Sequence, residues 1–209
     1  MKKKHIIFDL DGTLSDTAKA TAAAISRVEK QYELPKISIS HIHAAMGLAD
    51  LEFYAHLYPN ESAEKLMKAG AAIDSLEEEA IKAIGKEILF PGVMDMLTGL
   101  VNNGYNLYIA STGSENHVYT TLISAGIEKL FTAISCGEPA KILMVKNIIA
   151  GRDPQKWVMV GDMFKDSEAA RNNNILALGA GFGYLAEEDR RLFDGALSEP
   201  GEIYDYLKE

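Results

Sequence analysis

The sequence lacks the features of cross-linked and nucleic-acid-binding proteins. Only one of its 209 residues is a cysteine, Cys136, so a disulfide within this chain and a cysteine-based metal cluster are both excluded. Basic residues are also scarce, because 21 Lys and Arg stand against 30 Asp and Glu, which gives a net charge of −9 at pH 7. Nucleic acids and anionic membrane surfaces attract clustered Lys and Arg. We therefore expect neither as a partner.

Long hydrophobic runs are absent as well. The apolar run near the N-terminus, residues 6–8, is too short for a signal peptide. The longest uncharged stretch, residues 96–114, is interrupted by Asn102, Asn103 and Gly104, whereas a membrane-spanning helix needs about 20 apolar residues. With 47% hydrophobic and 24% charged residues, the composition is that of a globular protein. We expect a soluble, cytoplasmic protein.

Short apolar segments alternate with helical ones over most of the chain. Residues 5–8 form the first expected strand, and Gly12 follows it closely. The further expected strands are 107–110, 131–134, 157–160 and 175–178, and the helices between them are 93–101, 115–124, 140–150 and 167–172. Short buried strands between helices are typical of a parallel sheet covered on both faces. We therefore predict an α/β protein with a doubly wound, Rossmann-like parallel sheet.

Residues 16–83 have a different texture, in which Ala, Glu, Lys and Leu recur at helical spacing without a strand signal. Breaks near Pro35, Gly47 and Pro59 divide this stretch into about four helices, with Ser40 and Ser62 as candidate N-caps. We therefore predict a small all-helical cap domain at residues 16–83, inserted into a catalytic core made of residues 1–15 and 84–209. The two connections to the core would lie close together and form a hinge.

Carboxylates follow two of the expected strands. In a sheet of this kind, ligands bind outside the carboxyl ends of the strands. Asp9 and Asp11 follow the first strand, with Gly12 to permit an unusual backbone angle, and Asp162 and Asp166 follow the fourth. The alternatives are an ordinary turn for the first pair and an N-cap for Asp166. Carboxylates gathered at one edge repel one another unless a cation lies among them, and oxygen ligands favour Mg²⁺.

Groups suited to an anion follow the second and third strands. Ser111 and Thr112 offer hydroxyls and, with Gly113, backbone N–H groups at the start of a helix, which is a natural phosphate cradle. Lys141, near the start of the next helix, could add a fixed positive charge. Taken alone, residues 111–114 also suit an ordinary N-cap cluster, and Lys141 suits a solvated surface.

In order and spacing, these residues resemble the four motifs of the haloacid dehalogenase superfamily of phosphohydrolases. The chain is most similar to members with a helical cap, the phosphoglycolate phosphatase and β-phosphoglucomutase group. The resemblance covers nearly the whole chain and includes residues 90–93 and 181–184. The lysine segment, residues 137–141, is shorter than the loop common in the family, which leaves Lys146 as an alternative to Lys141. The motif residues are Asp9, Leu10, Asp11, Gly12, Thr13, Leu14, Ser111, Thr112, Gly113, Lys141, Gly161, Asp162 and Asp166.

The resemblance implies a role for each carboxylate. Asp9 would be the nucleophile that forms an aspartyl-phosphate. Asp11 would protonate the leaving oxygen and later deprotonate the attacking water. Mg²⁺ would be held by the Asp9 side chain, the Asp11 backbone carbonyl and Asp162. Asp166 would orient Asp162 or a metal-bound water from behind.

The remaining implied roles concern phosphate and the leaving group. Ser111, the Thr112 amide and Lys141 would bind the phosphoryl oxygens. The leaving group would meet a cap loop formed by Met46, Gly47 and Leu48, which lies between two expected helices. A plain turn is the alternative interpretation of this loop.

Two histidines, His41 and His43, are two residues apart and face different sides of a helix. With no third ligand evident, we expect packing rather than a metal site there, and a structural role for His117.

These patterns predict a Mg²⁺-dependent phosphohydrolase acting on a small phosphorylated metabolite. Phosphoglycolate is the first candidate by family analogy, and a monomer is the default. A phosphosugar mutase is the main alternative, since it shares every motif. A phospho-receiver domain also combines an acidic pair, a hydroxyl residue and a lysine, but such domains are shorter and have no inserted cap. A dehalogenase needs no Mg²⁺ and typically has no second acid at the position of Asp11.

Overall fold

Six parallel strands form the centre of the computed structural model, which describes residues 3–46, 48, 50–138 and 140–207. Their spatial order is β3-β2-β1-β4-β5-β6. The central strand, β1, pairs with β2 and with β4, so that Phe8 lies beside Ile109 and Val160. The strands are β1 (His5–Phe8), β2 (Asn106–Ser111), β3 (Phe131–Cys136), β4 (Trp157–Gly161), β5 (Leu176–Ala180) and β6 (Gly195–Leu197). The five predicted strands are confirmed.

The sixth strand, β6, was not predicted from the sequence. It has three residues, begins with a glycine and lies at the edge of the sheet beside β5. A segment this short contains too few apolar or β-branched residues to produce a recognisable strand pattern. Its place in the sheet therefore depends on tertiary pairing rather than on a local signal.

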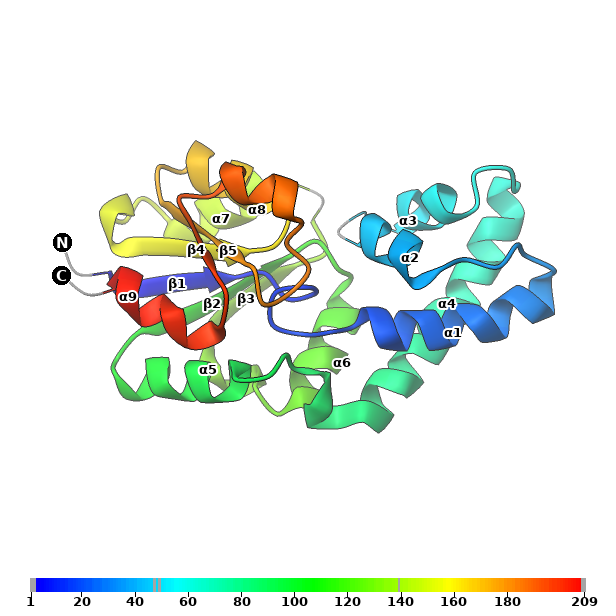
Figure 1. Cartoon of the computed structure of the whole chain (residues 1–209), viewed down its shortest axis with the longest axis horizontal. Helices are drawn as coiled ribbons and strands as arrows, with labels where there is room; N and C mark the ends of the chain where they lie inside the picture. Colours follow the sequence, from blue (N-terminus) through cyan, green and yellow to red (C-terminus); the bar gives the residue numbers. More distant parts are fainter. Residues whose placement is uncertain (1–2, 47, 49, 139, 208–209) are drawn as a thin grey trace.

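Both faces of the sheet are covered by helices, as Figure 1 shows. Along β1, Ile6 and Phe8 pack on one face with α5 (Val93–Asn102), α6 (Glu115–Ala125) and α9 (Ile203–Leu207), whereas Ile7 packs on the other with α7 (Lys141–Ile149) and α8 (Phe164–Asn172). All three side chains are fully buried, which explains why β1 is a continuous apolar run. The doubly wound α/β fold is confirmed. Short 3₁₀ helices lie at Gly85–Ile88, Glu128–Leu130, Pro154–Lys156, Glu187–Leu192 and Pro200–Glu202.

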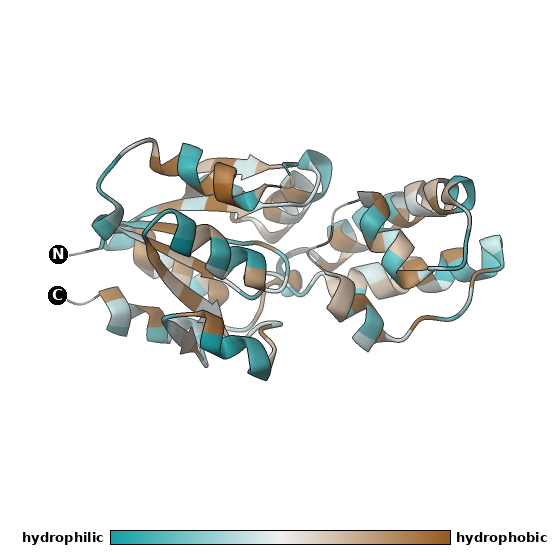
Figure 2. Cartoon of the chain, turned by 90° about the horizontal axis from the view of Figure 1, so that it is seen from above, coloured by the Kyte–Doolittle hydropathy of each residue, from teal (hydrophilic) through white to brown (hydrophobic). Residues whose placement is uncertain are grey.

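The four helices between β1 and α5 form a separate layer beyond the carboxyl ends of the strands (Figures 1 and 2). They are α1 (Ala18–Tyr32), α2 (Ile39–Ala45), α3 (Asp50–Leu57) and α4 (Ala63–Ile84). Their apolar side chains form a hydrophobic cluster of their own, centred on Ile25, Ile42 and Ile73. The predicted four-helix insertion is confirmed. The domain boundaries stay a prediction, and α4 ends at Ile84, one residue beyond the predicted cap limit.

The two N-cap predictions have different outcomes. Ser62 caps α4, because its side chain accepts a hydrogen bond from the Lys65 N–H. The Ser40 prediction is wrong, since Ser38 caps α2 by accepting from the N–H of His41. Starting α2 at Ile39 places Ile42 and Ala45 on its buried face, so packing of the cap decides between two serines that are equally suited as caps.

The entry to the cap and the return from it lie side by side. The Asp16 N–H donates to the Ile88 carbonyl at 2.7 Å, and the Phe90 N–H donates to the Leu14 carbonyl at 3.0 Å. These bonds confirm that the two connections are adjacent, while their action as a hinge stays a prediction. No helix in the described part of the chain combines the length and the apolar character needed to cross a membrane.

Candidate active site

Three carboxylates meet at the carboxyl ends of β1 and β4. Asp9 follows β1, Asp162 follows β4, and Asp166 lies in the first turn of α8. All three are buried, and one oxygen of each lies within 4.8 Å of the others. The pairing of β1 with β4 brings them together, because the Asp9 N–H donates to the Val160 carbonyl at 2.9 Å. The predicted gathering of carboxylates at one sheet edge is therefore present.

Two glycines make room for this cluster. Gly12 has a φ of +80°, a backbone conformation that other residues rarely adopt. A Cβ atom on Gly12 would also overlap the Asp162 carboxylate, and a Cβ atom on Gly161 would overlap the Asp166 carboxylate. Both positions therefore need glycine for close approach, and the φ of Gly12 confirms the unusual backbone angle predicted there.

Lys141 begins α7 and lies among these carboxylates. Its Nζ atom is 2.8 Å from Asp9 Oδ1 and 2.6 Å from Asp166 Oδ1, and its side chain is 5% exposed. The surface alternative for Lys141 is thus wrong, because two buried carboxylates hold the ammonium group in place. Lys146, the other lysine considered, is exposed in the last turn of the same helix.

The carboxylate cluster is electrostatically strained. Burial raises the pKa of Asp9 to about 7, because the charge of Lys141, which lowers it, does not outweigh burial and the nearby Asp166. Burial and the charges of Asp9 and Asp166 likewise raise the pKa of Asp162 well above its ordinary value. One lysine therefore does not balance three carboxylates at this edge of the sheet.

The donor set fits a hard divalent cation. Asp162 Oδ1 accepts a hydrogen bond from the Thr13 hydroxyl at 2.7 Å. Its other oxygen, Oδ2, is buried and has no hydrogen-bond partner among the described residues. A buried carboxylate oxygen without a partner is costly, and a group of carboxylate oxygens is the ligand type that Mg²⁺ prefers. Asp9 and Asp162 are therefore suited to hold such an ion.

Asp166 differs from Asp162 because both of its oxygens have partners. Its Oδ2 accepts from the backbone N–H groups of Asp162 at 3.2 Å and Met163 at 3.0 Å, and its Oδ1 accepts from Lys141. Asp166 is the third residue of α8 and its N-cap is Met163, so the N-cap alternative is wrong. Asp166 nevertheless satisfies backbone donors at the start of α8 and fixes the backbone of Asp162.

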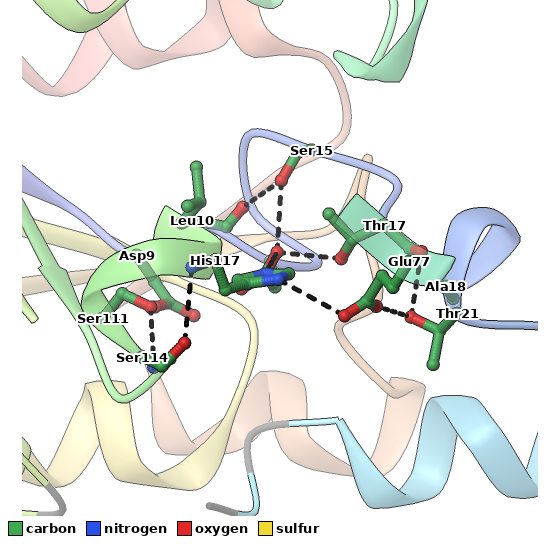
Figure 3. A network of polar contacts seen from close by, with 12 residues as sticks. Asp9, Leu10, Ser15, Thr17, Ala18, Thr21, Glu77, Ser111, Ser114 and His117 are labelled. Atoms are coloured by element: carbon green, nitrogen blue, oxygen red, sulfur yellow. Dashed lines mark hydrogen bonds and ion pairs between the residues drawn. The ribbon is translucent and has the colours of Figure 1, made fainter. Parts of the chain in front are cut away.

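Asp11 points away from this cluster and toward the cap. Its Oδ1 accepts from the Thr17 hydroxyl at 2.8 Å, and both carboxylate oxygens lie 3.0 Å from His117 Nε2. The opposite ring atom, His117 Nδ1, lies 3.4 Å from a carboxylate oxygen of Glu77 on α4. Figure 3 shows this chain of contacts continuing from Glu77 to Thr21. His117 therefore links the core carboxylate Asp11 to helix α4 of the cap.

These contacts shift two pKa values in opposite directions. Burial alone would lower the pKa of His117, but the charges of Asp11 and Glu77 and their hydrogen bonds outweigh it and raise the pKa well above 6.5. Burial alone would raise the pKa of Asp11, but the His117 charge and the hydrogen bonds from His117 and Thr17 lower it. The sequence pattern gave His117 only a structural role, and its contact with Glu77 depends on how the cap docks.

The residues that follow β2, 111–114, have two structural roles. Ser114 is the N-cap of α6 and accepts from the His117 N–H at 3.3 Å. Ser111 is buried at the end of β2, and its Oγ accepts from the Gly113 N–H at 3.1 Å. Ser111 and Thr112 both line the cavity that contains Asp9. The segment is therefore both an N-cap cluster and a group of donors beside Asp9.

A cavity of about 240 Å³ lies between the sheet and the cap. The core contributes Asp9, Asp11 and Ser111 to its lining, and the cap contributes Met46 and Leu48 of the predicted cap loop. Gly47, the third residue of that prediction, lies outside the described residues.

Neither His41 nor His43, the histidine pair of the cap, lines this cavity. The ring of His43 stacks on that of Tyr184 at 4.5 Å, and His41 contacts Ser38, so packing is the better interpretation of the pair.

Comparison with known proteins agrees with this geometry. A sequence model described as haloacid dehalogenase-like hydrolase matches residues 6–180. A phosphoglycolate phosphatase from Agrobacterium fabrum is 31% identical over 201 residues, covering 85% of this chain and 80% of that protein.

Solved structures share the fold. A haloacid dehalogenase-like family hydrolase from Streptococcus pneumoniae superposes with a TM-score of 0.84 at 23% identity, over 99% of both chains. A β-phosphoglucomutase from Clostridium difficile superposes with a TM-score of 0.80 at 19% identity, over 98% of this chain and 95% of that one. Together with the family match over residues 6–180, these similarities establish that the chain belongs to the haloacid dehalogenase-like hydrolase family.

Proposed function

We propose that this chain is a Mg²⁺-dependent phosphatase that hydrolyses a small phosphomonoester through an aspartyl-phosphate on Asp9. The observation that carries the proposal is the position of Asp9. It lies at the end of the central strand, 2.8 Å from Lys141, and lines a cavity together with Ser111 and Thr112. The similarity to a phosphoglycolate phosphatase supports the same reaction class.

The first half of the reaction transfers the phosphoryl group to the protein. A carboxylate oxygen of Asp9 attacks phosphorus, the bond between phosphorus and the ester oxygen breaks, and the departing oxygen takes a proton from Asp11. Ser111, the Thr112 amide and Lys141 hold the phosphoryl oxygens, whose negative charge they offset. Because its pKa is lowered, Asp11 needs a proton before this step, and His117 Nε2, 3.0 Å from both its oxygens, is the adjacent donor.

The second half returns the protein to its starting state. Water attacks the phosphorus of the aspartyl-phosphate, Asp11 takes the proton of that water, and the bond between phosphorus and Asp9 breaks to release inorganic phosphate. Asp11 then passes the proton back to His117 Nε2, which restores the starting protonation state. The lowered pKa of Asp11 suits it to act as the base in this step. Splitting one difficult displacement into two easier ones is the general advantage of a covalent intermediate.

Asp9, Asp162 and the backbone carbonyl of Asp11 would hold Mg²⁺, while Asp166 keeps Asp162 in place through the backbone. The bound ion would reduce the repulsion between the Asp9 carboxylate and a phosphate dianion. The unpartnered Asp162 Oδ2 supports this assignment. Lys141, held between Asp9 and Asp166, supplies a second positive charge beside the nucleophile.

Phosphate release from an aryl phosphate tests the proposal. We expect hydrolysis in the presence of Mg²⁺, loss of activity with EDTA and loss of activity in Asp9→Asn. Asp95→Asn is the matched control, because Asp95 is exposed on α5. Full turnover by Asp9→Asn would contradict the proposal.

A second assay separates hydrolysis from isomerisation. The β-phosphoglucomutase similarity, at 19% identity, concerns the fold alone, yet a mutase would use the same residues. A mutase would isomerise a sugar phosphate when supplied with a bisphosphate and release little phosphate. We expect the opposite balance, with phosphate as the main product. Phosphoglycolate is the first metabolite to test, because of the name of the related enzyme.

A further inference from the structure

Tyr184 lies at the junction between the core and the cap, in the loop that follows β5. Its backbone N–H donates to the Gly12 carbonyl at 2.9 Å, so this loop is fixed to the loop that begins at the nucleophile, Asp9. A Cβ atom on Gly183 would overlap the same carbonyl, which shows how closely the two loops approach. Residues 181–184 are part of the family resemblance, but the proposed reaction gives Tyr184 no role.

The ring of Tyr184 packs into the cap. It stacks on His43 of α2, with ring centroids 4.5 Å apart, and meets the ring of Phe90 edge-on at 5.5 Å. Among the described residues that form the hydrophobic cluster of the cap, Tyr184 is the one that comes from the core. The contacts of this ring therefore depend on the docked position of the cap, and they fix where its hydroxyl group lies.

The hydroxyl group of Tyr184 bridges two residues at the entry to the cap. It donates a hydrogen bond to Asp16 Oδ1 and accepts one from the Ala18 N–H at 3.1 Å. Burial and the hydrogen bond to Asp16 raise the pKa of Tyr184, so the hydroxyl keeps its proton and is the donor in this pair. Asp16 and Ala18 are the two neighbours of Thr17, and Tyr184 therefore holds the chain on both sides of that residue.

Thr17 does not cap the helix that it precedes. A threonine at this position typically accepts a hydrogen bond from an N–H group of the first turn, but the Thr17 side chain makes no such bond to α1. Its hydroxyl donates to Asp11 Oδ1 at 2.8 Å instead. The Ala18 N–H, which has no partner within the helix, is satisfied by Tyr184. Tyr184 thus supplies an acceptor at the start of α1 while the Thr17 hydroxyl is directed toward Asp11.

Given the proposed phosphatase activity, on which this inference rests, we propose that Tyr184 is a positioning residue for Asp11 and acts through Thr17. Tyr184 does not line the active-site cavity. With the cap docked, it holds residues 16–18 where the Thr17 hydroxyl reaches Asp11, and that bond orients the carboxylate that transfers the proton. The orientation of the acid would therefore depend on the contact between the loop after β5 and the cap.

Tyr184→Phe tests the inference, because it removes the hydroxyl group and keeps the ring. In single turnovers, we expect phosphoryl transfer from an alkyl phosphate to slow about tenfold, the effect of one hydrogen bond. Transfer from an aryl phosphate should slow less than about twofold, because its leaving group departs without a proton. Equal losses for both esters would overturn the inference, since they would show that the hydroxyl does not act on the acid. Tyr206→Phe is the control, because Tyr206 is exposed on α9.

A double variant tests the path through Thr17. Thr17→Val removes the donor to Asp11, and in this background Tyr184→Phe should cause no further loss of transfer from the alkyl phosphate. Additive losses would overturn the path through Thr17.

A crystal structure of Tyr184→Phe gives a readout that does not depend on activity. We expect the Thr17 hydroxyl to move out of hydrogen-bonding distance of Asp11, and a contact that stays at 2.8 Å would overturn the inference. Absence of aryl phosphate hydrolysis by the unaltered protein would instead contradict the proposed activity, while the structure of the variant would still decide whether Tyr184 positions Thr17.

Discussion

Two carboxylates on one loop, Asp9 and Asp11, have environments with opposite effects. Around Asp9, burial and a neighbouring carboxylate outweigh the charge of Lys141 and raise its pKa to about 7. Around Asp11, the charge of His117 and hydrogen bonds from His117 and Thr17 outweigh burial and lower the pKa. The two pKa values differ because the two carboxylates have different numbers of cationic and hydrogen-bonding partners. Asp9 shares one lysine with two further carboxylates, whereas Asp11 has a cationic histidine and a hydroxyl group.

The Asp9 side and the Asp11 side of the loop therefore require different kinds of positive charge. The Asp9 side has surplus carboxylate and an unpartnered oxygen on Asp162, so it gains most from a metal cation. The Asp11 side is balanced by a proton held on His117. Pairs of acids whose pKa values are moved apart by their surroundings are a general sign of divided catalytic roles. Removing each partner in turn should therefore have different consequences.

Asp11→Asn is expected to have the largest effect on turnover. Loss of the acid and base should lower kcat for an alkyl phosphate by about 10²–10⁴-fold. The loss should be much smaller for the first half-reaction of an aryl phosphate, because its leaving group departs without a proton. Burst and steady-state kinetics on a matched alkyl and aryl pair would measure this. Equal losses in the phosphoryl-transfer step for both esters would contradict the role of Asp11 as an acid.

Lys141→Met tests the Asp9 side. Removing the ammonium group should lower kcat by about 10²–10³-fold, because one donor to the phosphoryl oxygens is lost. The variant should also lose about 3–5 kcal/mol of unfolding free energy, since Asp9 and Asp166 remain buried without their partner. Denaturant unfolding and phosphate release would measure both changes.

Lys146→Met is the matched control, because it removes an exposed lysine from the same helix. Added Mg²⁺ should restore part of the stability of Lys141→Met, since the ion would replace some of the missing positive charge. Equal activity and equal stability of Lys141→Met and Lys146→Met would contradict the role proposed for the ion pairs of Lys141.

His117→Gln tests the Asp11 side through pH. A group whose pKa is raised on folding stabilises the protein fully below its unfolded pKa, 6.5 for histidine, and this contribution disappears as the pH rises through the folded value. The unaltered protein should therefore exceed His117→Gln by about 1.5–3 kcal/mol near pH 6. The gap should close at alkaline pH. Denaturant unfolding across this range, with exposed His41→Gln as control, would measure it, and a gap that is independent of pH would contradict the ion pairs.

The sequence predicts the Asp9 side better than the Asp11 side, for a physical reason. Asp9, Asp162 and Asp166 each follow a strand closely, and a parallel sheet brings such positions to one edge whatever else surrounds them. The contact of His117 with Glu77 instead joins two helices 40 residues apart through the docking of the cap, and no local pattern encodes that distance. The same limit applies to β6, which is too short to give a strand signal, and to Ser38, which packing selects over Ser40.

Glu77→Gln has the smallest expected effect and tests the contact that the sequence did not reveal. Thr21 and His117 contact different carboxylate oxygens of Glu77, so the glutamine amide removes the negative charge and one of the two acceptors. We expect kcat to fall about twofold to tenfold, corresponding to about 0.5–1.5 kcal/mol, because His117 would hold its proton less firmly beside Asp11. Steady-state kinetics would measure it, with exposed Glu79→Gln as the control. The effect should vanish in the His117→Gln background, since Glu77 acts on Asp11 only through that ring. Additive losses in the double variant would show instead that Glu77 affects turnover by another route.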